Sequence, residues 1–135
     1  MKALSIHPLY AGMIFAGKKT VECRTWKTEY RGEILICSTN KLLKGTIPGH
    51  AICTVQLVDI VPFKREHIKP ACMVDMPDGD CYAWILDNVR IIRPVPVKGK
   101  LSLWTYDGEI EYLEEPETDE EDEKMYNEIW KPLFT

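Results

Sequence analysis

Apolar and polar residues alternate along several short stretches, the pattern of β-strands with one buried face. This alternation predicts strands over residues 2–7 and 20–25. Four apolar residues in a row within residues 33–38 predict a strand buried on both faces. Between the first two strands, a proline suits the first turn of a helix and a glycine its end. We therefore expect a short helix over residues 8–16.

The same pattern continues, interrupted by loops, as far as residue 106. About six short strands with one early helix predict a mostly β fold, a small and mainly antiparallel barrel. We expect a short helical turn over residues 64–69. The later strands are expected at residues 50–61, 81–86, 89–94 and 101–106, with a turn at Asp87 and Asn88 between the second and third of these.

The composition is that of an ordinary globular domain. The chain has 135 residues, of which 45% are hydrophobic and 28% charged, which excludes a wholly disordered or fibrous protein. No apolar run approaches the roughly 20 residues of a membrane span, and the N-terminus lacks the pattern of a secretory signal. The five cysteines are odd in number and include no CxxC pair, which predicts free thiols in a reducing, cytoplasmic compartment. The spacing of histidines and cysteines matches no compact metal site, so we expect neither a metal nor a cofactor.

Charge divides the chain into a basic body and an acidic tail. Residues 1–106 carry 15 basic and 9 acidic side chains, whereas residues 107–135 carry 2 and 12. We expect the body to form the domain and to favour nucleic acid or another anionic partner. Apolar residues at helical spacing in the tail predict a helix over residues 119–131 that packs on the barrel: Met125, Tyr126, Ile129 and Trp130. The tail can act as a solvating segment, as a cover for the basic surface or as a surface for a protein partner.

The densest group of chemically useful residues is Gly17-x-Lys19-x-x-Glu22-x-Arg24. Alternation along the predicted strand places Glu22 and Arg24 on one face, and Lys19 lies at the start of that strand. Two cations and a carboxylate can hold a phosphate or the polar edge of a base. A lysine beside another cation can also have a lowered pKa and act as a base or a nucleophile. The alternative is an exposed edge strand with paired charges.

Other residues are candidates for binding or proton transfer, each with a structural alternative. His7 titrates near neutrality and can act as a general acid or base, or can hydrogen-bond the backbone at the start of the helix. Trp26, Tyr30 and Trp84 can stack on an unpaired base, although Trp84 also suits a core position. Cations that can contact phosphates are Arg31, Lys98 and Lys100, which also suit turn positions.

The signature spacing resembles that of ASCH domains, a branch of the PUA-like superfamily. Four further segments resemble the family in the same order and extend the resemblance over roughly Met1 to Trp104. They are Met1–Ile6 followed by Pro8; Trp26 with Tyr30-Arg31-Gly32; Tyr82-Ala83-Trp84; and Pro94–Trp104. The acidic tail has no counterpart in this resemblance.

The resemblance implies a PUA-like β-barrel with a cleft beside the first helix, lined by Lys19, Glu22 and Arg24. Family members bind or act on RNA or modified nucleosides, so the expected function is recognition of such a ligand. One branch removes the acetyl group of N4-acetylcytidine with a lysine, a threonine and a glutamate. Lys19 matches that lysine, but Glu22 stands where the threonine would be, and Thr20 is two residues away.

A second implied activity is cleavage of RNA. In that case Lys19 and Arg24 would stabilise phosphate charge, and Glu22 or His7 would move a proton. The sequence leaves three alternatives open: a binding module, a hydrolase of either kind, and a protein-interaction module that uses the acidic tail.

Overall fold

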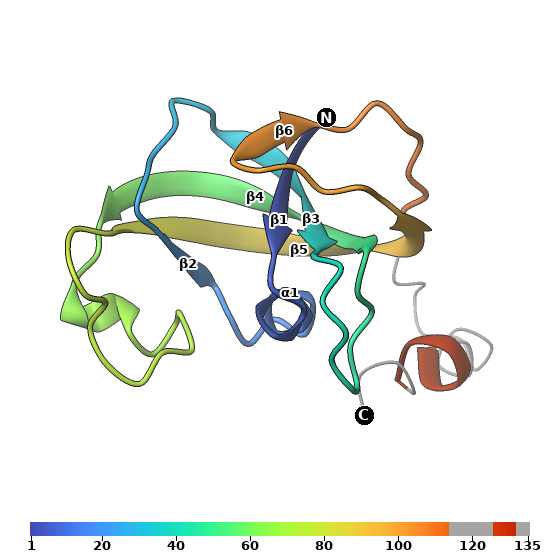
Figure 1. Cartoon of the computed structure of the whole chain (residues 1–135), viewed down its shortest axis with the longest axis horizontal. Coiled ribbons are helices and arrows are strands. Elements are labelled where there is room, and N and C mark those ends of the chain that lie inside the picture. Colours follow the sequence, from blue (N-terminus) through green and yellow to red (C-terminus); the bar gives the residue numbers. More distant parts are fainter. Residues whose placement is uncertain (114–125, 132–135) are drawn as a thin grey trace.

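The computed structural model describes residues 1–113 and 126–131 (Figure 1). Its strands form one six-stranded sheet in the order β2-β5-β4-β3-β1-β6. The helical elements are α1 (Pro8–Phe15), the 3-10 helix η1 (Arg65–His67) and the π-helical turn η2 (Tyr126–Trp130). The strands are β1 (Lys2–Ile6), β2 (Val21–Arg24), β3 (Gly32–Ser38), β4 (His50–Pro62), β5 (Tyr82–Pro96) and β6 (Leu103–Thr105).

The sheet is a curled half-barrel and not the closed barrel expected from the sequence. Strands β1 and β3 are parallel and all other neighbours are antiparallel, but the two edge strands, β2 and β6, do not pair with each other. The curl nevertheless brings β2 close to β1, because Nη2 of Arg24 donates a hydrogen bond of 3.1 Å to the carbonyl oxygen of Ser5. This contact spans three intervening strands of the sheet.

Both faces of the sheet are covered, as the unbroken apolar run in β3 predicts. Alternate residues Ile34 and Ile36 point toward α1, where the main core also contains Trp84. Leu35 and Cys37 point to the opposite face and pack with Trp104. Residues after β5 cover this second face through partly buried side chains: Val97, Tyr106, Ile110 and Tyr112.

The prediction of two strands with a turn at Asp87 and Asn88 was wrong, because β5 runs unbroken for 15 residues. It pairs with β4 over nearly its whole length. The pairing register shifts near Asp87 and Asn88, which marks a β-bulge there. Asn88 adopts the left-handed conformation (φ 50°), which asparagine tolerates better than most residues. The turn-forming residues therefore mark a bulge inside a strand. The other predicted elements of the body form within a few residues of their expected bounds.

We call residues 107–113 the C-terminal strap. They run along the C-terminal half of β5, on the same edge of that strand whose N-terminal half pairs with β2. The amide of Arg93 donates to the carbonyl of Glu111, and the amide of Leu113 donates to that of Ile91, both at 2.9 Å. The Arg93 and Glu111 side chains also pair at 3.0 Å. These contacts fix the start of the acidic tail on the domain.

The predicted C-terminal helix lies mostly outside the described residues. Tyr126–Trp130 is helical, and of the expected apolar stripe only the Ile129 side chain can be placed; it is 45% exposed. The other side chains of the stripe lie outside the described residues. The expected packing of the helix on the barrel therefore stays a prediction. Among the described residues, no helix is long and apolar enough to cross a membrane.

Candidate functional site

Lys19 is held in a buried position between the end of α1 and a loop that precedes β5. Its amide and that of Lys18 both donate to the carbonyl of Met13, which ends the helix. Its ammonium group donates a 2.6 Å hydrogen bond to the carbonyl of Ala71 and lies 5.3 Å from the centre of the Tyr10 ring. Lys19 is only 3% exposed. The loop is anchored there because the amides of Thr20 and Val21 both donate to the Pro70 carbonyl.

Glu22 and Arg24 lie on the same face of β2, as its alternation predicts. Glu22 is 8% exposed, and its Oε1 accepts a hydrogen bond of 3.1 Å from the amide of Cys23. Its Oε2 is buried and has no partner among the described residues, and the same is true of Nε of Arg24. The site therefore contains one unused acceptor and one unused donor. We call Lys19, Glu22 and Arg24 the signature cluster.

The charges of the signature cluster act on one another in a poorly hydrated environment. Burial lowers the pKa of Lys19, and the Glu22 carboxylate opposes this shift. Burial also raises the pKa of Glu22, and the cations Lys19 and Arg24 oppose that shift. The two shifts therefore run in opposite directions, the pKa of Lys19 downward and that of Glu22 upward.

The aromatic residues predicted to stack on a base are mainly part of the core. Trp84 is fully buried, donates its Nε1 hydrogen to the carbonyl of Trp26 at 3.2 Å, and packs edge-on against the Trp26 ring at 4.7 Å. Trp84 therefore occupies the core position given above as its alternative, and its ring is not exposed to solvent. Trp26 and Tyr30 are half-buried against the same core, and the Tyr30 hydroxyl donates to the Glu33 carbonyl.

His7 and Arg31 both make the structural contacts given above as their alternatives. Nδ1 of His7 accepts a hydrogen bond of 3.2 Å from the amide of Leu9 at the start of α1. Arg31 donates to the carbonyls of Thr28 and Tyr30 and pairs with Asp59 at 3.6 Å. Neither contact joins these residues to the signature cluster.

Lys98 and Lys100 are exposed and lie in the segment between β5 and β6, which packs close to β1. A Cβ atom on the intervening Gly99 would lie 2.4 Å from Oγ of Ser5, so this approach requires glycine. Ser5 is also the residue whose carbonyl binds Arg24. The two lysines thus flank Gly99, whose neighbour Ser5 contacts the signature cluster.

Sequence reasoning missed two parts of the surroundings. Tyr10 and the backbone of Ala71 contact the Lys19 ammonium, and only the position of Tyr10 on the predicted helix offered a signal.

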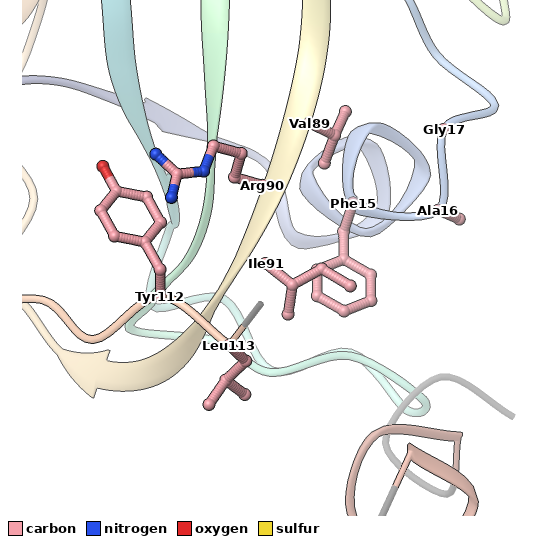
Figure 2. A pocket seen from close by; sticks show the side chains of 8 residues that line it. All are labelled: Phe15, Ala16, Gly17, Val89, Arg90, Ile91, Tyr112 and Leu113. Carbon is pink, nitrogen blue, oxygen red and sulfur yellow. The ribbon is translucent and has the colours of Figure 1, made fainter. Parts of the chain in front are cut away.

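A cavity of about 540 Å³ also lies beyond the end of α1, away from the signature cluster. Figure 2 shows Phe15, Val89, Ile91 and Leu113 around it, with Arg90 on the other side of β5 toward Tyr112. Within the described residues, no three His, Cys, Asp or Glu side chains are arranged to hold a metal ion.

Comparison with known proteins agrees with this architecture. The chain matches the ASCH domain over residues 4–129, and it therefore belongs to the ASCH domain family. No curated protein matches it.

Solved structures with the same fold include the ASCH protein of Zymomonas mobilis. That crystal structure is 18% identical, covers 95% of this chain and 94% of its own, and has a TM-score of 0.62. A serine-to-alanine mutant of the same protein is 19% identical, covers 78% and 88%, and has a TM-score of 0.60. A tyrosine-to-phenylalanine mutant is 18% identical, covers 95% and 96%, and has a TM-score of 0.59. At these identities the likeness concerns the fold alone.

Proposed function

We propose that this chain recognises a base, within RNA or as a modified nucleoside, at the signature cluster. The observation that carries the proposal is the pair of buried, unpartnered atoms, Oε2 of Glu22 and Nε of Arg24. Leaving such atoms unsatisfied costs about 1–3 kcal/mol each. A ligand that satisfied both would recover this free energy on binding.

The two atoms favour a base over a phosphate group as the ligand at this point. An ionised carboxylate only accepts hydrogen bonds and repels phosphate, whereas the Nε–H of arginine only donates. The polar edge of a base offers an N–H beside a carbonyl oxygen or a ring nitrogen, and can therefore supply a partner both to an acceptor and to a donor. The exposed Lys98 and Lys100 flank Gly99, whose backbone lies against Ser5, and would contact the attached phosphates.

A binding measurement with a matched pair of variants tests this proposal. Nucleosides and short single-stranded RNAs of each base are titrated into the wild-type chain, Glu22→Gln and Glu29→Gln, where Glu29 is an exposed carboxylate. We expect Glu22→Gln to weaken binding about tenfold or more, and Glu29→Gln to leave it unchanged. Equal affinities in all three proteins, or no binding by the wild type, would contradict the proposal.

A hydrolase is the second candidate, favoured by the lowered pKa of Lys19. In its neutral form Lys19 would take a proton from an attacking water molecule. Glu22, whose pKa is raised by burial, would return a proton to the leaving atom. The carboxylate of Glu22 replaces the threonine expected of the acetylcytidine-hydrolysing branch, so the chemistry would not follow that branch residue for residue.

A turnover assay separates the two candidates. N4-acetylcytidine and single-stranded RNA are incubated with the wild type, Lys19→Ala and the exposed neighbour Lys18→Ala as control. Product formed by the wild type and by Lys18→Ala, but not by Lys19→Ala, would identify a hydrolase and its substrate. Binding without product would leave the chain a recognition module.

A further inference from the structure

The five cysteines lie in different environments, although none is in a disulfide. Cys37 and Cys53 are fully buried in the two cores, and burial raises the pKa of Cys37 to about 12. The thiol of Cys72 donates to the carbonyl of Lys18 at 3.4 Å. The other two, Cys23 and Cys81, are both partly exposed.

Cys23 and Cys81 form a pair of thiols across two strands. Cys23 stands opposite Ala83 in the antiparallel pairing of β2 with β5, and Cys81 lies two residues before Ala83. Such diagonal neighbours are on the same face of a sheet, about 7–8 Å apart, so a disulfide between them needs a small movement of the backbone. The neighbouring Cys81 thiol contributes to the raised pKa of Cys23, and both side chains pack against the small cluster that contains Val21 and Phe63.

We propose that Cys23 and Cys81 are a redox modification site, at which a two-electron oxidant such as a peroxide forms a disulfide between β2 and the start of β5. The Cys81 thiolate attacks one peroxide oxygen, the O–O bond breaks, and a sulfenic acid and water form. The Cys23 sulfur then attacks the Cys81 sulfur, which releases a second water. Two thiols are oxidised by two electrons, and one hydrogen peroxide is reduced to two molecules of water.

The surroundings give the two thiols different roles. Cys23 lies between Glu22 and Arg24 within β2, and burial, together with the neighbouring Cys81 thiol, raises its pKa to about 11. The thiolate is the reactive form of cysteine, so Cys23 is poorly suited to the first attack. Cys81 precedes β5 at the end of a loop and reacts first. Cys23 is then the resolving thiol.

The disulfide would act on the neighbourhood of the signature cluster. It would join β2, which carries Glu22 and Arg24, to the end of the segment that supplies the Ala71 carbonyl to Lys19. Formation of the bond does not depend on what the cluster binds. The proposal therefore stands or falls separately from the proposed function.

Thiol counting and peptide mapping test the proposal on the full chain. The reduced protein is treated with hydrogen peroxide, free thiols are counted after denaturation, and unreduced digests are analysed by mass spectrometry. We expect the count to fall from five to three, with Cys23 and Cys81 in one cross-linked pair of peptides. Five remaining thiols, a cross-link that includes Cys72, or a disulfide between two chains would overturn it.

Single variants test the order of attack. In Cys23→Ser, dimedone should label Cys81 as a trapped sulfenic acid, whereas in Cys81→Ser it should leave Cys23 unlabelled. Cys72→Ser is the matched control and should form the cross-link at the wild-type rate. Labelling of Cys23 in Cys81→Ser, or loss of the cross-link in Cys72→Ser, would contradict the assigned roles.

Discussion

At the scale of single residues, the unusual feature is an ammonium and a carboxylate that are both removed from solvent. Lys19 retains only the Ala71 carbonyl as a hydrogen-bond partner among the described residues, and Glu22 retains only the Cys23 amide. Burying charge without full compensation destabilises a fold, and such sites are commonly functional. The cost is present here at Lys19 and Glu22.

The raised pKa of Glu22 predicts a dependence of stability on pH. Above pH 4.5 the unfolded chain loses the Glu22 proton, whereas the folded chain keeps it until the pH passes the raised value. Its stabilising contribution is therefore complete below pH 4.5 and is lost as the pH rises through the raised pKa. The free energy of unfolding of the wild type should fall relative to that of Glu22→Gln as pH increases from 4 to about 7 in urea titrations.

The exposed carboxylate of Glu29 supplies the control for this measurement. The difference between the wild type and Glu29→Gln should not follow the same course with pH. A wild-type stability that rises relative to Glu22→Gln over this range would show that the cations outweigh burial at Glu22.

Gly99→Ala tests the close approach of the turn to β1. The new Cβ would lie 2.4 Å from Oγ of Ser5, which already accepts a hydrogen bond from Nε1 of Trp104. One of these groups must move, so we expect a loss of about 1–3 kcal/mol in the free energy of unfolding. In the Ser5→Ala background the same substitution should cost less. Equal costs in both backgrounds would place the strain elsewhere.

At the scale of elements, two long strands, β4 and β5, and the loop between them position the site. Strand β2 has only four residues and pairs with β5 alone, so its geometry depends on β5 and on the loop that holds Lys19. Strand β5 in turn pairs with β4 along one side, and it meets β2 and the C-terminal strap on the other. The strap therefore completes an edge that β2 leaves uncovered.

Tyr112→Phe tests the contribution of the strap. The Tyr112 hydroxyl donates to Oε1 of Glu33, and its ring lies 3.7 Å from the guanidinium of Arg90. Loss of the hydroxyl should lower the free energy of unfolding by about 1 kcal/mol and speed hydrogen exchange at the Arg93 and Leu113 amides. Tyr106→Phe removes a longer 3.4 Å bond and should have a smaller effect. Unchanged exchange in Tyr112→Phe would mean that the backbone bonds alone hold the strap.

At the scale of the whole molecule, charge is distributed unevenly along the chain. Residues 1–106 have a net charge of +6, and residues 107–135 have a net charge of −10. A polyanion approaching the domain is attracted by the first part and repelled by the second. The balance between these forces depends on the ionic strength, because salt screens separated charges.

Truncation after Leu113 tests that balance and keeps the strap in place. It removes nine acidic and two basic residues and changes the net charge from −4 to +3. Affinity for single-stranded RNA should rise several-fold at about 50 mM salt and much less at about 300 mM, as measured by fluorescence anisotropy. A gain of equal size at both salt concentrations would point to a contact rather than to repulsion.

Much of the fold could be predicted from local pattern. The alternation in β1, β2 and β4 and the apolar run in β3 gave those strands within a few residues, and the proline and glycine around α1 gave its ends. The error at Asp87 and Asn88 arose because residues that favour turns also suit a bulge in a strand that has a long partner. The contacts of the C-terminal strap left no local signal.

For the candidate site, the sequence by itself determined only how the side chains are directed along β2. Spacing along β2 placed Glu22 and Arg24 on one face, with Lys19 at the start of that strand. Only the tertiary structure decided that Lys19 is buried against Ala71, that Trp84 belongs to the core, and that Cys23 meets Cys81. Spacing fixes the direction of a side chain within its own strand, whereas burial and partners depend on which distant segments the curl of the sheet brings together.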